Sequence, residues 1–304
     1  MSLTTNLTLF KFKNVRLKAI LLLLITATMW SLGGMLIKSI NAHPLAIAGV
    51  RSAIASVVFL IILGKPRMNW TRVQMGAAAS YAGTVIFFVI ATKATTAANA
   101  IFLQYTAPIY VALLSSRLLK EKTKVLDWVT VLIVLGGMVL FFLDNLSTTG
   151  IMGNIFGIIS GICFALQIIF LRMQKDGSPW ESVFLGNIIT AIIGLPFLTT
   201  AWPNAFDWVE LLILGVVQLG LPYILYTIAI KHTTALEAIL IPVIEPILNP
   251  LWVLLFLGEK PGSWSLIGGF IVLMAITIRC ILVEIPISFP VKVKRQNESH
   301  DSLG

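Results

Sequence analysis

Long apolar runs separated by short polar connectors fill almost the whole chain. Ten of these runs reach about 20 residues, the length that an α-helix needs to cross a bilayer. Several connectors hold the Pro, Gly or Asn that ends helices. The pattern predicts an all-α membrane protein with ten transmembrane helices, called spans 1 to 10, at residues 17–37, 44–64, 73–92, 98–118, 125–144, 152–171, 181–201, 208–230, 236–257 and 264–283.

Part of this pattern occurs twice. At a constant offset of 138 residues, segment 93–122 matches segment 231–260 at twelve of thirty positions without a gap. Composition bias supplies apolar matches, but not the framed Thr-Thr-Ala, the central proline and the terminal Glu-Lys. The chain therefore contains an internal repeat, and its most telling matched pairs are Thr95/Thr233, Thr96/Thr234, Ala97/Ala235, Pro108/Pro246, Glu121/Glu259 and Lys122/Lys260.

Each repeat holds five spans, and residues 30–38 of the first align more weakly with residues 164–172 of the second. An odd number of crossings makes the second repeat enter the membrane in the opposite sense to the first. The sequence thus predicts two inverted five-helix repeats. Many secondary transporters have this architecture, with the substrate site near the midplane between the halves.

Composition supports lipid as the solvent of these helices. The chain is 58% hydrophobic and 12% charged, whereas soluble domains carry about 25% charged residues. A net charge of +9 would suggest nucleic acid for a soluble domain, but here the basic residues lie in connectors, so no nucleic-acid partner is expected. Cys163 and Cys280 fall in apolar runs without metal or redox spacing, and we expect neither a metal nor a cofactor.

The basic residues predict the orientation. If the N-terminus is inside, eighteen Lys and Arg lie on the inner side and three on the outer side. Cytoplasmic connectors carry such an excess, so both termini are predicted to be cytoplasmic. A cleaved signal peptide is an alternative for the N-terminus, but the run from Ala19 to Ile37 is long for one and lacks a small-x-small exit. The bias suits a multi-pass protein of a bacterial cytoplasmic (inner) membrane.

The predicted organisation has four parts and no appended soluble domain. The polar composition of the last part is typical of disorder. The parts are a cytoplasmic N-terminal segment at 1–16, a first repeat at 17–144, a second repeat at 150–284 and a cytoplasmic tail at 285–304.

Some of these residues also carry a resemblance to a known family: Glu121-Lys122, Gly258-Glu259-Lys260, Glu245-Pro246, Arg51 after Pro44, and Trp30-Ser31. With them, residues 17–283 resemble the drug/metabolite transporter superfamily, in its ten-helix branch with two EamA-type repeats. The resemblance implies export of amino acids or related metabolites, with sugar, nucleotide-sugar or drug transport as alternatives. Two positions depart from symmetry between the halves: span 7 has no arginine answering Arg51, and Ala107 stands where the second half has Glu245.

Span 9 carries Pro242, Pro246 and Pro250 at intervals of four residues. Each proline lacks the N–H that would bond the carbonyl four residues earlier, so carbonyls in mid-membrane lose their helical partners. Such groups are tolerated against protein or a water-filled cavity. These prolines, with Pro108 in span 4, predict kinks, either for packing alone or to line a central pathway together with Glu245 and Asn249 on the adjacent face.

Two charged residues lie within the spans. A carboxylate such as Glu245 costs about 2.5–3.5 kcal/mol at mid-bilayer on insertion scales, so we expect it to be neutral, paired or open to water. It either staples helices or serves as a proton-coupling site or a contact for a substrate ammonium group. Arg51 in span 2 either snorkels or pairs helices, or it contacts a substrate carboxylate or an acid such as Glu245.

Polar and aromatic residues at interior positions complete the predicted cavity. Aromatic residues in membrane helices more often pack or anchor at the interface, but several here are far from a span end. The candidate substrate-binding residues are Trp30, Arg51, Tyr81, Gln104, Tyr105, Tyr223, Glu245 and Asn249.

The motifs of enzymes are missing: the sequence has no H-E-x-x-H, no G-x-S-x-G and no P-loop. The sequence therefore favours a secondary transporter that moves a small polar metabolite, most readily an amino acid, by alternating access. A proton is a candidate coupling partner, and oligomerisation is left open. A non-transporting membrane scaffold is the alternative class.

Overall fold

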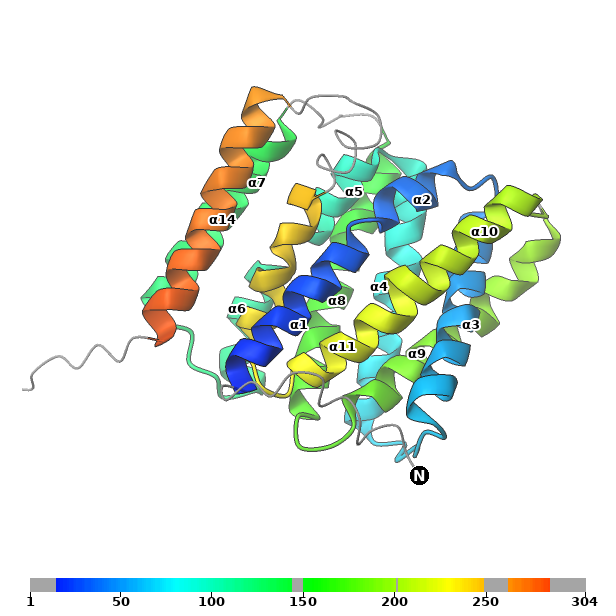
Figure 1. The fold of residues 1–304 in the computed structure, drawn as a ribbon, viewed down its shortest axis with the longest axis horizontal. Helices are drawn as coiled ribbons and strands as arrows, with labels where there is room; N and C mark the ends of the chain where they lie inside the picture. Colours follow the sequence, from blue (N-terminus) through cyan, green and yellow to red (C-terminus); the bar gives the residue numbers. More distant parts are fainter. Residues whose placement is uncertain (1–14, 144–149, 201, 249–261, 285–304) are drawn as a thin grey trace, which may run out of the picture.

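The computed structural model describes residues 15–143, 150–200, 202–248 and 262–284, and every regular element in these ranges is a helix (Figure 1). Within these ranges nine helical segments are long and apolar enough to cross a membrane, and they correspond to spans 1 to 8 and span 10. They are Val15–Ser39, Pro44–Leu63, Arg72–Ala94, Ala97–Leu118, Val125–Phe142, Ile151–Met173, Pro179–Thr199, Ala205–Ala229 and Ser263–Val283.

Five of these segments run as single helices through their spans. They are α3 (Pro44–Leu63), α4 (Arg72–Ala94), α7 (Val125–Phe142), α8 (Ile151–Met173) and α14 (Ser263–Glu284). In span 7, α9 (Pro179–Gly194) continues as the 3₁₀ turn η2 (Leu195–Thr199). These long helices form the continuous part of the bundle around the interrupted spans.

Three other spans are interrupted where the sequence predicts continuous helices. Span 1 divides into α1 (Val15–Trp30) and α2 (Gly33–Ser39), and span 4 into α5 (Ala97–Gln104) and α6 (Ala107–Leu118). Span 8 runs as α10 (Ala205–Ile213), the π-helical η3 (Leu214–Gly220) and α11 (Leu221–Ala229). Irregular backbone inside a membrane protein is stable where it is buried in protein or lines a cavity.

Span 9 is described as far as residue 248. It consists of α12 (Ala235–Leu240), the 3₁₀ turn η4 (Ile241–Val243) and one further helical turn at 244–248. The remainder of the predicted span, with Asn249 and Pro250, lies outside the described residues, as do residues 1–14 and the predicted tail at 285–304.

The sequence repeat has a structural counterpart at the start of spans 4 and 9. The Thr96 hydroxyl accepts from the Asn99 N–H (3.0 Å), and the Thr234 hydroxyl accepts from the Glu237 N–H (3.2 Å). Both threonines are N-caps, which satisfy orphan donors of a helix start. The two spans also break within the same turn of the repeat, at Tyr105 and at Ile241–Val243.

The packing of the spans repeats the same relation. α4 packs along α8, α1 packs along α11, α3 pairs with α9, and α7 pairs with α14. Exchanging each span with its counterpart in the other repeat turns the first pair into the second and leaves the last two pairs unchanged. The pattern of contacts between spans is therefore the one expected for two related halves that pack against each other.

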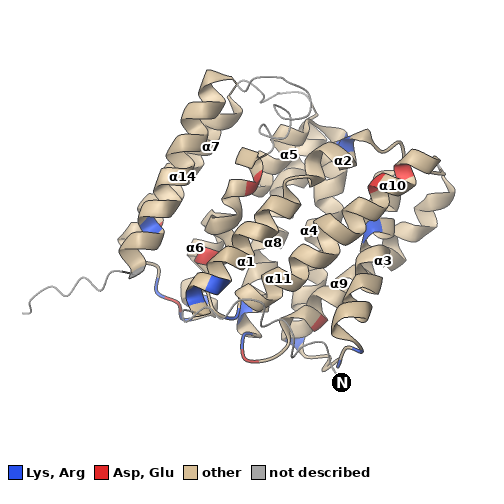
Figure 2. Ribbon diagram, viewed as in Figure 1, with Lys and Arg blue, Asp and Glu red and all other residues tan. Residues whose placement is uncertain are grey.

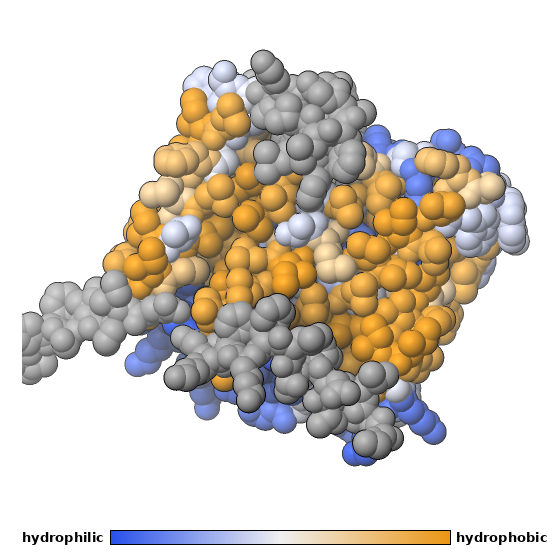
Figure 3. All heavy atoms as spheres, in the orientation of Figure 1, coloured by the Kyte–Doolittle hydropathy of each residue, from blue (hydrophilic) through white to orange (hydrophobic). Residues whose placement is uncertain are grey.

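The outer surface is apolar over the length of the helices, and charged residues gather toward their ends (Figures 2 and 3). Leu132 on α7 and Phe270 on α14 are among the exposed large side chains. The pair formed by these two helices stands at one side of the molecule (Figure 1). Such a surface matches lipid rather than water.

The end of the molecule where α1 begins carries the ion pairs of the described residues. Arg279 on α14 contacts Asp127 on α7 through Nε and Nη2 (3.0 and 2.8 Å). Glu237 at the start of α12 pairs with Arg16 and lies 3.7 Å from Arg279. These bonds connect the α7–α14 pair to spans 1 and 9.

A second group at this end joins the halves through Glu121. Its carboxylate accepts from Arg172 Nε (2.8 Å) and from the Ala235 N–H (2.9 Å) at the start of α12. Arg172 also donates to the carbonyls of Ile230 and Lys231. At the opposite end Lys38, which aligns with Arg172, donates to the carbonyls of Thr92 and Thr95. The two halves thus use matched basic residues to hold the ends of spans 3 and 8.

Helix packing between α7 and α14 depends on a glycine without room for a side chain. A Cβ on Gly268 would overlap the backbone of Phe141 and Gly137. We expect Gly268→Ala to destabilise the protein by about 1–3 kcal/mol, as overpacking does, and to lower the midpoint of thermal unfolding in detergent. A Cβ on Gly136 meets nothing within 4 Å, so Gly136→Ala is the matched control and should be neutral or slightly stabilising. Equal midpoints for the two variants would contradict the packing.

Candidate functional site

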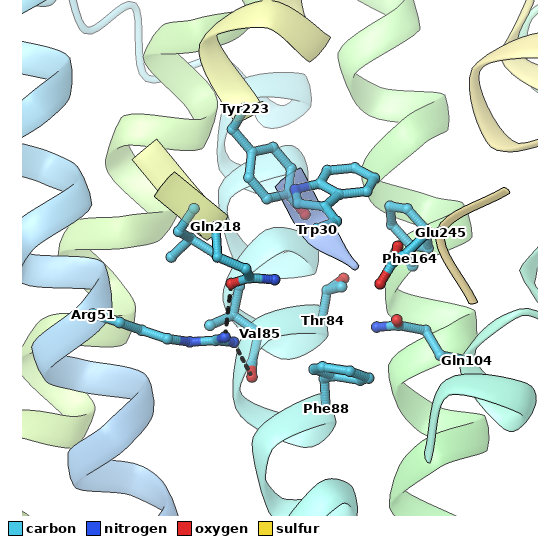
Figure 4. Close-up of a pocket in the computed structure, with 11 residues that line it drawn as sticks. Trp30, Arg51, Thr84, Val85, Phe88, Gln104, Phe164, Gln218, Tyr223 and Glu245 are labelled. Atoms are coloured by element: carbon cyan, nitrogen blue, oxygen red, sulfur yellow. Dashed lines mark hydrogen bonds between the residues drawn. The ribbon is translucent and has the colours of Figure 1, made fainter. Parts of the chain in front are cut away.

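A small polar cavity lies where the interrupted spans meet (Figure 4). Trp30 is the last residue of α1, Gln104 is the last residue of α5, Gln218 belongs to η3, and Glu245 follows η4 by two residues. The cavity has a volume of about 40 Å³, which holds a few water molecules but no metabolite. Its wall consists of Trp30, Arg51, Thr84, Val85, Phe88, Gln104, Phe164, Gln218, Leu219, Tyr223 and Glu245.

Arg51 reaches the cavity from the middle of α3, and its side chain is buried, with 1% exposed. Nη1 donates to Gln218 Oε1 (3.1 Å), and Nη2 donates to the Val85 carbonyl at a longer 3.4 Å. Nε has no hydrogen-bond partner, and none of the ion pairs of the described residues includes Arg51. The guanidinium is held by neutral groups, and its charge is not balanced by a neighbouring carboxylate.

The π-helical segment supplies the amide that holds Arg51. π-Helical turns interrupt helices at functional sites more often than elsewhere, and η3 directs Gln218 toward Arg51 (Figure 4). A Cβ on Gly33 would lie 2.6 Å from Nε2 of Gln218. A glycine at the start of α2 therefore leaves the room that this amide occupies.

Glu245 contributes its carboxyl group from the opposite side of the cavity. In Figure 4, Arg51 and Glu245 lie on opposite sides, and they form no ion pair with each other. The Tyr105 Oη atom lies 2.6 Å from Oε2 of Glu245. The cavity therefore has an unbalanced cationic side and a carboxyl side without a cationic partner.

Tyrosine hydroxyls satisfy the backbone that two prolines of span 9 leave open. Pro242 removes the helical partner of the Ala238 carbonyl, which instead accepts from Tyr226 Oη (3.1 Å). Pro246 does the same to the Pro242 carbonyl, which lies 2.9 Å from Tyr105 Oη. Both freed carbonyls are thus bonded inside the protein, as burial in a membrane requires.

Aromatic rings cover the part of the cavity near Glu245. The Trp30 ring packs against Tyr223, Tyr226 and Phe164, with centroids 5.0, 5.4 and 5.9 Å away. The indole N–H of Trp30 is buried without a hydrogen-bond partner. This wall offers π-faces, which attract cations, and one unused donor.

A chain of hydrogen bonds fixes the amide of Gln104. Its Nε2 donates to Ser160 Oγ on α8 (2.8 Å), and Ser160 donates to the Thr84 carbonyl on α4 (3.0 Å). The side-chain amide oxygen of Gln104 takes no part in these two hydrogen bonds, so the side chain can present an acceptor to the cavity. Spans 3, 4 and 6 are thereby tied together at the cavity wall.

The structure brings five of the candidate residues to the cavity wall: Trp30, Arg51, Gln104, Tyr223 and Glu245. Tyr105 does not line the cavity but contacts Glu245 through its hydroxyl group. Tyr81 donates to Asn187 Oδ1 (2.9 Å), and its ring forms a T-shaped contact with the ring of Tyr223. Pro108 follows the α5–α6 break. Asn249 and Pro250 lie outside the described residues.

Sequence reasoning did not place the other wall residues in the site. Gln218 was the one with a usable signal, because an amide in a mid-membrane run is rare and needs a partner. The remaining residues look like ordinary membrane-helix residues and become wall residues through the packing of their spans; they are Thr84, Val85, Phe88, Phe164 and Leu219.

Known proteins resemble this chain over most of its length. The model of the EamA-like transporter family matches it twice, at residues 17–143 and 151–279. An uncharacterized transporter of Archaeoglobus fulgidus is 29% identical over 68% of this chain and 76% of its own. The threonine/homoserine exporter RhtA of Salmonella typhimurium is 27% identical over 79% of this chain and 83% of its own.

Two further similarities extend over most of the sequence. The pseudopaline exporter CntI of Pseudomonas aeruginosa is 23% identical over 84% of this chain and 93% of its own. A crystal structure of a protein with 18% identity superposes with a TM-score of 0.74 over 87% of this chain and 96% of that one, which establishes a shared fold. The chain belongs to the EamA-like transporter family of the drug/metabolite transporter superfamily, as a multi-pass membrane transporter and not an enzyme.

Proposed function

We propose that this transporter exports a small zwitterionic metabolite, most readily an amino acid, by alternating access. The observation that carries the proposal is the arrangement of charge around the cavity. A buried guanidinium without a carboxylate partner faces it from α3, and a carboxyl group without a cationic partner faces it from span 9. A molecule with one carboxylate and one ammonium group complements both.

Arg51 is the proposed contact for the substrate carboxylate. A buried charge without a partner is costly, and the cost falls when an opposite charge arrives. Guanidinium groups also match carboxylates with two parallel hydrogen bonds. Nε, which has no partner, and Nη2, which makes only a long bond to Val85, supply suitable donors.

Glu245 and the aromatic wall are the proposed contact for the ammonium group. Carboxylates pair with ammonium ions, and the faces of Trp and Tyr rings attract them within about 6 Å of the ring centroid. Trp30, Tyr223 and Glu245 share the cavity wall. The names of two relatives, the threonine/homoserine and pseudopaline exporters, support an amino-acid-like substrate and the outward direction.

The proposed movement follows from inverted repeats with both termini in the cytoplasm. The matched N-caps and matched span contacts of the two halves support this reading, as does the excess of basic residues on the side of the N-terminus. The end with Glu121, Arg172 and Asp127 then faces the cytoplasm, and the membrane is the bacterial inner membrane. Because the cavity of about 40 Å³ is too small for an amino acid, the halves must part at one end before substrate binds.

Uptake into proteoliposomes tests the proposal. A panel of labelled amino acids is offered with and without an imposed pH gradient, to the wild-type protein and to Glu245→Gln. We expect saturable flux for some members, stimulation by the gradient, and loss of that stimulation in the variant. Flux that ignores both the gradient and the substitution would make the protein a facilitator with a structural Glu245. Flux for sugars, nucleotide sugars or drugs in place of amino acids would replace the substrate class, and silence toward every class would favour a scaffold.

A further inference from the structure

The Tyr105 hydroxyl lies between two acceptors that belong to the broken part of span 9. Its Oη atom is 2.9 Å from the Pro242 carbonyl oxygen and 2.6 Å from Oε2 of Glu245. Tyr105 itself occupies the break between α5 and α6. The hydroxyl is therefore the point at which the interruption of span 4 meets the interruption of span 9.

A count of hydrogens distinguishes two states of this contact. A tyrosine hydroxyl carries one hydrogen, and a backbone carbonyl can only accept. If Tyr105 donates to Pro242, the short contact with Glu245 needs a hydrogen from Glu245, so that its carboxyl group is protonated. If Glu245 is ionised, the Tyr105 hydrogen turns to the carboxylate, because hydrogen bonds to ionised acceptors are the stronger ones, and the Pro242 carbonyl loses its donor.

We propose that Tyr105 is a positioning residue that couples protonation of Glu245 to the joining of spans 4 and 9. With the proton on Glu245, both bonds are made and the two breaks are held together. When the proton leaves for water in the cavity, the hydroxyl rotates toward Glu245, and the freed Pro242 carbonyl loosens span 9. No covalent bond other than the O–H bond of Glu245 changes.

Other titratable groups near the Tyr105 hydroxyl do not change the number of hydrogens that Tyr105 and Glu245 share. From α11, Tyr226 donates to Ala238, and Tyr223 lies on the cavity wall beside Trp30. From α3, Arg51 lies across the cavity (Figure 4). The parts of α1, α4, α5 and α8 at the cavity present Trp30, Thr84, Val85, Phe88, Gln104 and Phe164, none of which titrates.

This inference rests on the proposed function for its consequence. A substrate ammonium at Glu245 requires the ionised carboxylate, so it displaces the proton and turns Tyr105 away from Pro242. Proton and substrate then compete for one carboxylate, and one proton is exchanged for one substrate molecule. The same displacement loosens the contact between the two halves.

Hydrogen–deuterium exchange of the reconstituted full chain tests, without a substrate, whether protonation of Glu245 controls the contact between spans 4 and 9. The readout is protection of residues 235–248 at acidic and alkaline pH, corrected for the intrinsic pH dependence of exchange, with α8 as the internal reference for folding. In the wild-type protein we expect protection of this segment to fall about tenfold on deprotonation, the size of one lost hydrogen bond. Glu245→Gln donates permanently to Tyr105 and should keep protection high at both pH values.

Tyr105→Phe is the decisive variant, and Tyr226→Phe is its matched control. Tyr105→Phe should lower protection to the same level at both pH values. Tyr226→Phe removes the donor of the other freed carbonyl but touches no carboxyl group, so it should lower protection and keep the wild-type response to pH. A wild-type pH response in Tyr105→Phe, or a lost response in Tyr226→Phe, would overturn the proposal. Because the readout needs no substrate, failure of amino-acid transport would leave this result standing, and the reverse also holds.

Discussion

Replacing Arg51 by methionine is expected to reduce transport of a zwitterionic substrate by more than about 100-fold while leaving the protein at least as stable. Two hydrogen bonds from a guanidinium to a carboxylate contribute about 1.5–3 kcal/mol each, and the substitution removes both. Stability should not fall, because Arg51 has no carboxylate partner and an apolar side chain of similar length avoids the cost of burying its charge.

The measurement is the initial rate of proteoliposome uptake against substrate concentration, together with thermal unfolding in detergent. Arg51→Lys keeps the charge but loses the paired geometry, so its rate should fall between those of the wild type and Arg51→Met. Ser52→Ala is the matched control, since Ser52 is buried beside Arg51 but does not line the cavity. Normal transport by Arg51→Met would remove Arg51 from the substrate site, and a large loss of stability would make it a structural residue.

Replacing Asp127 by asparagine is expected to give the largest loss of stability, about 3–5 kcal/mol. The buried Arg279 side chain donates twice to Oδ1 of Asp127 (3.0 and 2.8 Å), and removing one partner of a buried ion pair leaves an uncompensated charge. Glu237, at 3.7 Å from Arg279, offsets only part of the loss, because the same carboxylate also pairs with Arg16. The asparagine can still accept from the Lys124 N–H, which Asp127 caps at 2.8 Å.

Thermal unfolding in detergent measures this effect. The double variant Asp127→Asn/Arg279→Met removes the stranded charge and should recover much of the stability lost in the single variant. If the single variant unfolds at the wild-type temperature, the pair between α7 and α14 contributes nothing. An equal loss in both variants would show that the stranded charge of Arg279 does not cause the effect.

The sequence predicts the membrane class and nearly all the helical segments, because apolar runs of bilayer length leave few alternatives. The repeat at an offset of 138 also predicts matched contacts, and the Thr96 and Thr234 caps provide an example. The interruption of span 1 escapes prediction, since Val15–Ser39 contains no proline. Room for Gln218 beside Gly33 exists only in the packed structure.

The sequence predicts which charged residues belong to the candidate site, but not which residues contact one another there. Glu245 and Arg51 stand out because charges inside membrane helices need a reason. Their arrangement on opposite sides of one cavity depends on how spans 2 and 9 are placed in the packed structure. The contact of Tyr105 with Glu245, 140 residues away, has no periodicity that would indicate it. Long-range contacts of this kind come from the fold alone.

In the proposed complex one substrate molecule carries its carboxylate to Arg51 and its ammonium group to Glu245. The most direct measurement is competition against uptake of the best labelled amino acid by three unlabelled compounds: the amino acid itself, its carboxamide, and the corresponding acid without the amino group. We predict that the two analogues compete at least about tenfold more weakly than the amino acid, because each leaves one charged wall without a partner. Competition by either analogue as strong as that of the amino acid would contradict recognition of the substrate by both charged residues.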